Sequence, residues 1–501
     1  MPSSPTHANA PLNGPFDSLR DYIAAIEAHG KLLRIRQIDQ DTYEGTGFAY
    51  RLFDRMGETQ APSFVFEKVK TDGRWMTAPV YGNLFPGWWN EALAYGLTDL
   101  DDNERANHDR VVQHLIALNE KAGDWPRVEP VVVKASEAPC KEIVIGKDDV
   151  NILDYPWLKN NPADAGRYIN SGTIVLEDPQ LGRNVGTYRC QVKSRNKIGM
   201  NINPGQDGGR FIQILRSRGL RSVKAAIALG VEPILWSLGS TKLTAFGEDD
   251  YEVAGGLAGR PLKVVKCETS DILVPALAEM IIEGEIPLDD YEEEGPYGEL
   301  LGLMGEKKPK NMYMNITAVT QRRDPLFVNS FTGIFGGILR SPIKADYYLS
   351  FRKLIPNLVA VHSYERIPKI LVLSIDKKFP GEGMQAGQYA AASSVPRVVI
   401  VVDKEVDVLN PLEVLHAVGA RWQPSTGLII PQTRNTIFDP SLVVRGLSSK
   451  IVIDATQQWP QEGGPPHAPP VSRSELERLA PDVMDRVDQN WDRYWELWEK
   501  S

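Results

Sequence analysis

The sequence predicts an α/β protein whose two α/β ends enclose a middle part rich in β-strands and whose last segment is a helical arm. Three observations support this prediction. Helical and strand-like stretches alternate near both ends, short β-rich runs dominate between them, and apolar residues near the C-terminus recur at helical spacing. The chain has 501 residues, 42% hydrophobic and 24% charged, which is typical of a globular protein with several domains.

The N-terminal part combines a short tail with an α/β domain. We expect residues 1–15 to be a disordered tail and residues 16–125 to form the domain. Its first helix is indicated by apolar residues at three- and four-residue steps, Phe16, Leu19, Ile23 and Ile26. Gly30 stands just past this helix as a stop signal, and the strand-like "KLLRIRQ" follows.

Residues 126–325 differ from the N-terminal part in their sequence pattern and are expected to form a β-rich domain. Short runs such as "EPVVVKA", "GTIVLED", "GTYRCQVKS" and "MYMNITAVT" are separated by Gly, Pro, Asn and Asp. One helical insertion, "RFIQILRSRGLRS", interrupts them. Many short strands at this spacing predict a barrel or a sandwich.

The α/β alternation returns in residues 326–460, and residues 461–501 are expected to be a linker and an oligomerisation helix. "KILVLSID" and "RVVIVVD" are typical of strands buried on both faces. "GEGMQAG" lacks the glycine spacing of a dinucleotide-binding turn, so we expect a flexible loop there. In the last helix Trp491, Trp495 and Trp498 form an apolar stripe, which we expect to pack on a partner subunit. Packing on the N-terminal domain of the same chain is the alternative.

Composition and charge argue against several classes of protein. The formal net charge is -9 and no long Lys/Arg run occurs, so nucleic-acid binding is not expected. The first residues lack a secretory pattern, and no apolar run is long enough to predict a membrane span. The three cysteines, Cys140, Cys190 and Cys267, form no Cys-x-x-Cys pair and suit a reduced, cytoplasmic protein.

Motifs for several common chemistries are absent. The seven histidines are scattered and none lies in residues 126–325, so we expect no His-built metal site in that domain. No Gly-x-Ser-x-Gly nucleophile turn occurs. An oxygen-ligand site made of Asn, Gln, Asp and Glu stays open, and it would favour Mg²⁺, Mn²⁺ or a monovalent ion.

Two stretches, "NVGTYRCQV" and "YEEEGPYGEL", contain the strongest candidates for chemistry. Arg189 lies in an apolar strand context and therefore requires a carboxylate partner. Glu294 precedes a Gly-Pro turn and Glu299 follows it, so both carboxylates could converge on Arg189. The arginine would hold one carboxylate ionised while the other carries a proton, as a general acid does. The alternative is a solvated acidic loop, which is our expectation for Glu292 and Glu293.

Several motifs together resemble the UbiD family of prenylated-FMN-dependent decarboxylases. They are "LRDYIAAIEAHGKLLRI", "YGNLF", "APCKEIVIGKDDVNI", "NVGTYR", "VVKCETSDILVPALAEMIIEGEI", "EEEGPYGELLG" and "GLSSKIVIDATQQWP", in the same order along nearly the whole chain. The resemblance implies an α/β fold in which a central split β-barrel binds the flavin between N- and C-terminal α/β parts. It also implies a C-terminal helix that reaches a neighbouring subunit in a homodimer or higher homo-oligomer.

The implied reaction is reversible decarboxylation of an aromatic, heteroaromatic or α,β-unsaturated carboxylic acid through a covalent adduct with prenylated FMN. The implied partners are this acid and a flavin prenyltransferase that supplies the cofactor. By position, Arg189 matches the family's catalytic arginine, Glu294 its carboxylate partner, and Glu299 the acid that protonates the adduct after CO₂ leaves. Cofactor binding is implied for Asn184, Gly186, Thr187, Tyr188, Arg189, Gln206 and Glu252.

The sequence departs from the family pattern at two places. The family's divalent metal, Mn²⁺ or Mg²⁺, is held by an Asn, a His and a Glu. Asn184 and Glu252 match the first and last of these ligands, but Gly205 stands at the place of the histidine. Gln206 or Asp207, the next two residues, could donate an oxygen as the third ligand, with Asp207 as the candidate, or the site is altered or lost. K⁺ is an additional candidate ion.

The second departure is "NSFTGIFGGILRSP", which replaces an acidic, proline-containing segment. Ile334, Phe335 and Phe438 are candidate substrate-pocket residues, with core packing as the alternative. These departures leave a second hypothesis open, a non-catalytic cofactor-binding or assembly protein of the same fold.

Overall fold

The computed structural model describes residues 12–98, 100, 103–241, 243–364, 367, 369–393, 396–434, 441, 442, 444, 446–467 and 472–495. The chain divides into two compact units, Met1–Tyr347 and Tyr348–Ser501. Helix α8 (Ser341–Phe351) runs across the boundary between them. The finer expected boundaries at residues 125, 325 and 460 stay predictions.

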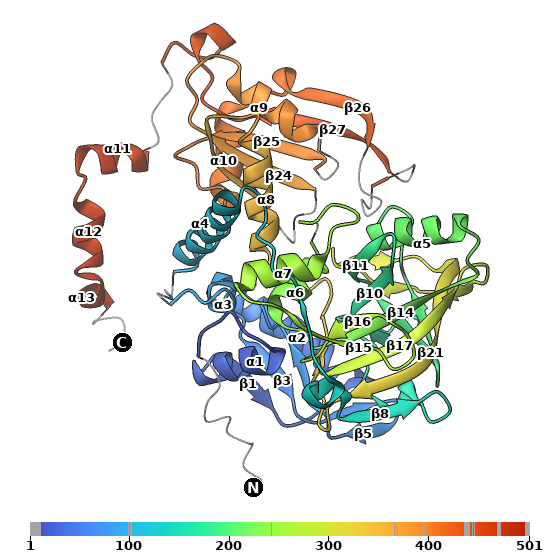
Figure 1. Cartoon of the computed structure of the whole chain (residues 1–501). Helices are drawn as coiled ribbons and strands as arrows, with labels where there is room; N and C mark the ends of the chain where they lie inside the picture. The colour runs from blue at the N-terminus through green and yellow to red at the C-terminus, as the bar shows by residue number, and fades with distance from the viewer. Residues whose placement is uncertain are drawn as a thin grey trace. The chain divides into compact units, whose positions relative to one another are not determined.

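The first unit begins with helices around a small sheet (Figure 1). Helix α1 (Leu19–Ala28) starts where the Ser18 side chain accepts a hydrogen bond from the Asp21 amide, and it buries Leu19, Ile23 and Ile26 as the sequence predicts. The sheet has the order β1 (Leu32–Ile35), β3 (Ser63–Phe66), β6 (Val80–Gly82) and β22 (Phe327–Val328). Strand β22 thereby ties the start of the replaced segment 329–342 to the N-terminal sheet.

Three further helices and a second small sheet complete this part. The helices are α2 (Glu44–Met56), α3 (Trp88–Ala94) and α4 (Glu104–Ala122), and the sheet is β2 (Ile38–Asp39), β4 (Val69–Thr71) and β5 (Arg74–Met76). Helix α4 ends at Gly123, whose φ of 79° is the left-handed conformation that glycine adopts without strain.

The middle of the chain forms a ten-stranded sheet in which all the paired neighbours are antiparallel. The main path runs β11 (Gly182–Thr187), β10 (Thr173–Asp178), β14 (Ser222–Leu229), β17 (Met280–Pro287), β21 (Lys308–Gln321), β13 (Lys197–Met200), β12 (Cys190–Ser194) and β9 (Tyr168–Ile169). Strands β8 (Ile143–Gly146) and β18 (Glu292–Glu294) also pair with β21.

The two ends of this path come close together. Strand β11 is one end, β12 lies next to the other end, and only Tyr188 and Arg189 connect these two strands. Three Cα–Cα steps span at most about 11 Å, so the sheet must curl. Among the described residues no ladder joins β11 to β9, so a closed barrel is not present in the part of the chain that the structure describes.

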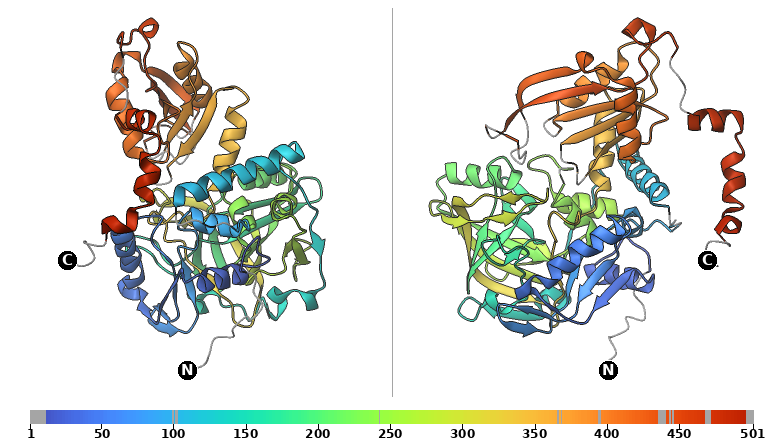
Figure 2. Two further views of the ribbon diagram at one scale, coloured as in Figure 1. Left: turned by 90° about the vertical axis from the view of Figure 1, so that its left-hand side faces the viewer. Right: turned by 180° about the vertical axis from the view of Figure 1, so that it is seen from behind.

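Three helices border β11, and a small sheet contacts β14. Helix α5 (Asp207–Ser217) is the predicted insertion, and α6 (Pro233–Leu238) and α7 (Asp250–Ala258) lie side by side next to β11 (Figure 1). The small sheet has the order β16 (Leu273–Pro275), β15 (Lys263–Lys266) and β7 (Val131–Val132). Figure 2 shows the curled sheet from two further sides.

The second unit contains a five-stranded sheet with the order β23 (Leu358–Ser363), β24 (Ile370–Ile375), β25 (Val398–Asp403), β27 (Leu447–Asp454) and β26 (Leu428–Arg434). The inner strands β24, β25 and β27 are parallel, and the first two are almost wholly buried, as the apolar runs predict. The prediction of a flexible loop at "GEGMQAG" is wrong, because α9 (Glu382–Ala391) begins inside it. Gly383 and Gly387 let that helix approach the side chains of Asp454 and Val452 closely.

The rest of the second unit is helical. Helix α10 (Pro411–Arg421) is followed, after β27, by α11 (Ser472–Leu479), α12 (Val483–Asp488) and α13 (Trp491–Trp495). No helix in the described part of the chain is long and apolar enough to cross a membrane.

Candidate active site

Arg189 lies at the break between β11 and β12 and contacts both predicted carboxylates. Its Nε and Nη2 donate to the two carboxylate oxygens of Glu294 at 3.0 and 2.7 Å, while Nη1 forms an ion pair with Glu299. The Glu294 side chain is fully buried, whereas 35% of the Glu299 side chain is exposed. The site therefore holds one fixed and one accessible carboxylate on a single guanidinium.

The turn between the two carboxylates explains how they converge. Strand β18 ends at Glu294, Gly295 turns the chain with a φ of 76°, and the hairpin of β19 (Tyr297–Gly298) and β20 (Met304–Gly305) follows. A side chain at position 295 would be strained at this φ and would come within 3.1 Å of the Glu306 carbonyl oxygen. Glu299 leaves the end of β19, so the turn directs its carboxylate back towards Arg189.

Two buried tyrosines complete the surroundings of the guanidinium. Tyr297 lies 5.0 Å from the Arg189 guanidinium carbon, measured to the ring centre, and its ring is 4.3 Å from that of Tyr168. The Tyr168 hydroxyl donates to Glu294 Oε1 at 3.0 Å. Burial alone would lower the pKa of Arg189, but Glu294 and Glu299 raise it, so the guanidinium stays charged.

The remaining two acidic residues of "YEEEGPYGEL" point elsewhere. Glu292 pairs with Lys197 at 2.5 Å and Glu293 pairs with Lys307 at 2.7 Å, and all four side chains are at least 29% exposed. Partly solvated ion pairs of this kind contribute little to the stability of the folded protein.

The replaced segment after β22 packs directly against the hairpin that carries Glu299. Thr332 Oγ1 donates to the Gly298 carbonyl oxygen at 2.8 Å, and Asn170 Nδ2 bonds to the Ser330 carbonyl oxygen at 2.8 Å. Ile334 and Phe335 are 2% and 5% exposed and belong to the hydrophobic core, so the structure places them in packing rather than on an open surface. Phe438 lies outside the described residues.

Strand β11 presents polar groups that lack partners. Asn184 Oδ1 and Thr187 Oγ1 are buried, and neither has a hydrogen-bond partner among the residues that the structure describes. Tyr188 lies beside them, and its hydroxyl is bonded to the Gly208 amide at the start of α5. A side chain at position 208 would come within 2.6 Å of the Tyr188 hydroxyl and 3.2 Å of Asn184 Oδ1, so a glycine lets the start of α5 approach both groups. Gly186 lies on the same strand, and an added Cβ would meet the Tyr188 ring.

The carboxylates near this strand differ from those expected. Glu252 pairs with Arg127 at 3.8 Å, and Gln206 folds back so that its Oε1 accepts from the Asn203 amide at 2.8 Å. Asp250, which the sequence analysis did not single out, is 4% exposed and accepts from the Val185 amide at 2.9 Å. Burial, with a contribution from Asp207, raises the pKa of Asp250 to about 6.

These contacts bear on the expected metal ligands. The charges of Asp207 and Asp250 add to burial in raising the pKa of the Tyr188 hydroxyl, whereas Glu252 pairs with Arg127. Within the described ranges no cluster of three or more His, Cys, Asp and Glu side chains is arranged to hold a metal ion.

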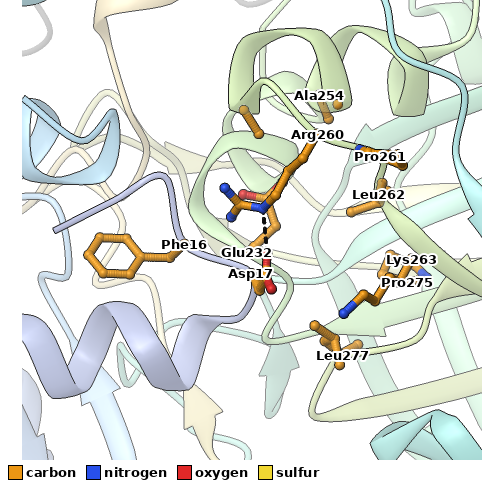
Figure 3. A pocket seen from close by; sticks show the side chains of 13 residues that line it. Phe16, Asp17, Glu232, Ala254, Arg260, Pro261, Leu262, Lys263, Pro275 and Leu277 are labelled. Carbon is orange, nitrogen blue, oxygen red and sulfur yellow. Dashed lines mark hydrogen bonds and ion pairs between the residues drawn. The ribbon is translucent and has the colours of Figure 1, made fainter. Parts of the chain in front are cut away.

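A separate small cavity lies between α1, α7 and β15 and does not include this site (Figure 3). Arg260 and Asp17, which form an ion pair, and Glu232 are among the residues that line it. Its volume of about 30 Å³ has room for one or two water molecules. It is too small for a carboxylic acid substrate.

Comparison with known proteins agrees with this geometry. Residues 131–335 match the family model described as the 3-octaprenyl-4-hydroxybenzoate carboxy-lyase Rift-related domain, and residues 338–455 match the C-terminal domain of the same carboxy-lyase. The phenolic acid decarboxylase of Sedimentibacter hydroxybenzoicus is 29% identical, with 90% of this chain and 93% of that protein covered.

Two solved structures extend the comparison to the fold. The UbiD-class enzyme HmfF from Pelotomaculum thermopropionicum, in complex with FMN, is 30% identical with a TM-score of 0.77, covering 93% of this chain and 100% of that one. An evolved dimeric form of HmfF, in complex with prFMN, is 29% identical with a TM-score of 0.73, covering 91% and 98%. With both family domains matched and the same fold over nearly its whole length, the chain belongs to the UbiD family of carboxy-lyases.

Proposed function

We propose that this protein is a reversible, non-oxidative decarboxylase that acts on an aromatic, heteroaromatic or α,β-unsaturated carboxylic acid with prenylated FMN as its cofactor. The observation that carries the proposal is the pair of carboxylates on Arg189, one fully buried and one partly exposed. A flavin prenyltransferase in the same cytoplasmic compartment would supply the cofactor.

The residues of β11 fit a bound flavin. The unpartnered oxygens of Asn184 and Thr187 lie on the strand at the edge of the curled sheet, and glycines at 186 and 208 let the Tyr188 side chain lie close beside them. We propose that this sheet is the split barrel expected from the sequence. When bound, prenylated FMN supplies the electron sink that accepts the pair left behind as CO₂ departs.

The chain's own residues supply orientation and a proton. Arg189, kept charged by its partners, would attract the carboxylate of the substrate. Glu294, buried and bonded through both oxygens, fixes the guanidinium in place. Glu299 has the accessible carboxylate and would deliver its proton to the carbon that loses CO₂.

The metal ligands that we propose here differ from those expected from the sequence. Asn184, Asp207 and Asp250 offer only oxygen atoms, which suits Mg²⁺ or Mn²⁺ and does not require the missing histidine. We therefore prefer Asp250 to Glu252 as the acidic ligand. K⁺ stays a prediction.

The proposal is tested by co-expressing the protein with a flavin prenyltransferase and screening aryl and acrylic acids for CO₂ release in D₂O. The active acid should give a product with deuterium at the carbon that carried the carboxyl group. Glu299→Gln should lower kcat by about 10²–10⁴-fold while the flavin absorbance of the purified protein is unchanged.

The matched control is Glu293→Gln, which removes a neighbouring carboxylate that pairs only with the partly exposed Lys307 in the contacts described here. It should retain wild-type kcat. Wild-type turnover by Glu299→Gln would refute the acid role of Glu299.

The second candidate is a non-catalytic cofactor-binding or assembly protein. The absence of the family's metal histidine is the observation that favours it, since Asp207 begins α5 near the corresponding position. A wild-type protein that binds prenylated flavin but releases no CO₂ from any of the acids would support this candidate.

A further inference from the structure

The hydrogen bond between Tyr168 and Glu294 has no place in the reaction as proposed so far. Glu294 Oε1 accepts two hydrogen bonds, one from Arg189 Nε and one from the Tyr168 hydroxyl, both at 3.0 Å. Tyr168 is 2% exposed and lies 126 residues before Glu294 in the chain. A buried carboxylate is stabilised by each donor that reaches it, so a third donor beyond the two of the guanidinium restricts its position further.

We propose that Tyr168 is a positioning residue for the decarboxylation, which locks Glu294 against Arg189 and so leaves Glu299 as the only movable carboxylate of the pair. This inference rests on the proposed function. It assigns a role to a residue outside the motifs "NVGTYR" and "EEEGPYGELLG".

The strand that carries Tyr168 explains why its hydroxyl reaches this place. Strand β9 pairs with β12, with Tyr168 opposite Gln191 and Ile169 opposite Cys190, so β9 is anchored to the strand that begins one residue after Arg189. The Tyr168 ring also packs on Tyr297, whose hydroxyl is bonded to Asn170 at 3.2 Å. Register and ring packing together aim the hydroxyl at the carboxylate.

The chemistry of Tyr168 suits a permanent donor. Burial and the adjacent Glu294 carboxylate raise the pKa of its hydroxyl, so it stays protonated at neutral pH. It therefore acts as a hydrogen-bond donor to Glu294 Oε1. The two carboxylates of the site thus differ in hydrogen bonding as well as in exposure.

The first test compares Tyr168→Phe with Tyr22→Phe in the enzyme loaded with prenylated flavin. Tyr22 is equally buried and its hydroxyl donates to the Leu84 carbonyl oxygen at 2.6 Å, so it controls for the loss of a buried hydroxyl. We expect Tyr168→Phe to lower kcat by about tenfold to a hundredfold with KM changed less than twofold. Tyr22→Phe should leave kcat unchanged. An unchanged kcat in Tyr168→Phe would overturn the proposal.

The second test needs no activity and uses the protein without cofactor. The melting temperatures of Tyr168→Phe, Glu294→Gln and the double variant form a thermodynamic cycle. If the Tyr168 hydroxyl holds the Glu294 carboxylate, the decrease in melting temperature of the double variant should be clearly smaller than the sum of the decreases in the two single variants.

The two tests separate the possible failures. Additive losses would overturn the positioning role whether or not the protein is a decarboxylase. Non-additive losses in a protein that decarboxylates no acid would refute the proposed function, and with it the catalytic purpose of the bond, while the bond itself would stand.

Discussion

Arg189 binds two carboxylates in different ways, and the difference depends on the shape of its side chain. Its planar guanidinium directs Nε and Nη2 to both oxygens of Glu294 and leaves Nη1 for Glu299. A lysine ammonium is a point charge on a flexible stem and cannot make this forked contact. The guanidinium shape, rather than the positive charge alone, keeps the two carboxylates apart.

Arg189→Lys should therefore impair the reaction although the charge is kept. We expect kcat/KM to fall by about 10-fold to 10²-fold, because a charge-assisted hydrogen bond of about 1.5–3 kcal/mol is lost. The measurement is steady-state decarboxylation of the acid found in the screen. The control is Arg218→Lys, because Arg218 forms an ion pair with Asp178 at 3.0 Å and contacts none of the three site residues in that pair. A loss of less than threefold would show that charge alone suffices.

At this scale the sequence predicts some site residues and misses others. Glu294 and Glu299 could be predicted to converge because Gly295 and Pro296 force a turn between them. Asp250 and Glu252 lie two positions apart on α7, so they point to different sides of the helix, and spacing alone cannot say which side faces β11. Tyr168 is distant in sequence, and only the register of β9 brings it in.

At the scale of elements, α6 links a buried carboxyl group to strand β11. The Glu232 carboxylate accepts from the Ile234 and Leu235 amides at the start of the helix, both at 2.7 Å. At the other end of α6, the Gly239 carbonyl oxygen accepts from the Thr187 amide at 2.6 Å. Burial raises the pKa of Glu232 to about 7, although the two amides and Arg260 act in the opposite direction.

This raised pKa predicts a dependence of stability on pH. Between its ordinary value of 4.5 and about 7, Glu232 holds its proton in the folded state and loses it in the unfolded state. The free energy of unfolding contributed by this group therefore falls as pH rises through that window. Glu232→Gln cannot titrate, so its melting temperature should decline less than that of the wild type between pH 5 and pH 7. Equal declines, measured by scanning calorimetry, would contradict the assignment.

Elements with strong local patterns could be predicted, whereas their assembly could not. The periodic apolar residues of α1 and the apolar runs of β24 and β25 agree with the structure. The local pattern of apolar residues indicates whether one face or both faces of an element are buried. The α9 helix was missed because Gly383 and Gly387 suggest a loop, whereas here they allow close packing against β27. The curl of the ten-stranded sheet depends on pairings between distant strands, which no local pattern records.

At the scale of the whole molecule, the C-terminal helices expose apolar side chains. Leu479 in α11 is 69% exposed, and Trp491 and Tyr494 in α13 are 51% and 55% exposed. Large aromatic side chains that stay exposed along one segment indicate a surface for another protein. The side chain of Trp495 and the whole of Trp498 lie outside the described parts, so the exposed Trp491 is the observation that supports the predicted stripe. Its expected occupant, a second copy of the chain, stays a prediction.

Removing this arm should change the assembly without removing the candidate active site, all of whose residues lie in the first unit. A chain that ends at Pro470 should form assemblies with fewer subunits than the full chain at the same concentration, because the aromatic contacts with the second copy are lost. Light scattering measures the number of subunits in each assembly. Trp491→Ala with Tyr494→Ala should shift the equilibrium in the same direction. Asp485→Ala, which changes an exposed polar position of α12, serves as the control. If the truncated chain forms assemblies with the same number of subunits as the full chain, the arm instead packs within its own subunit.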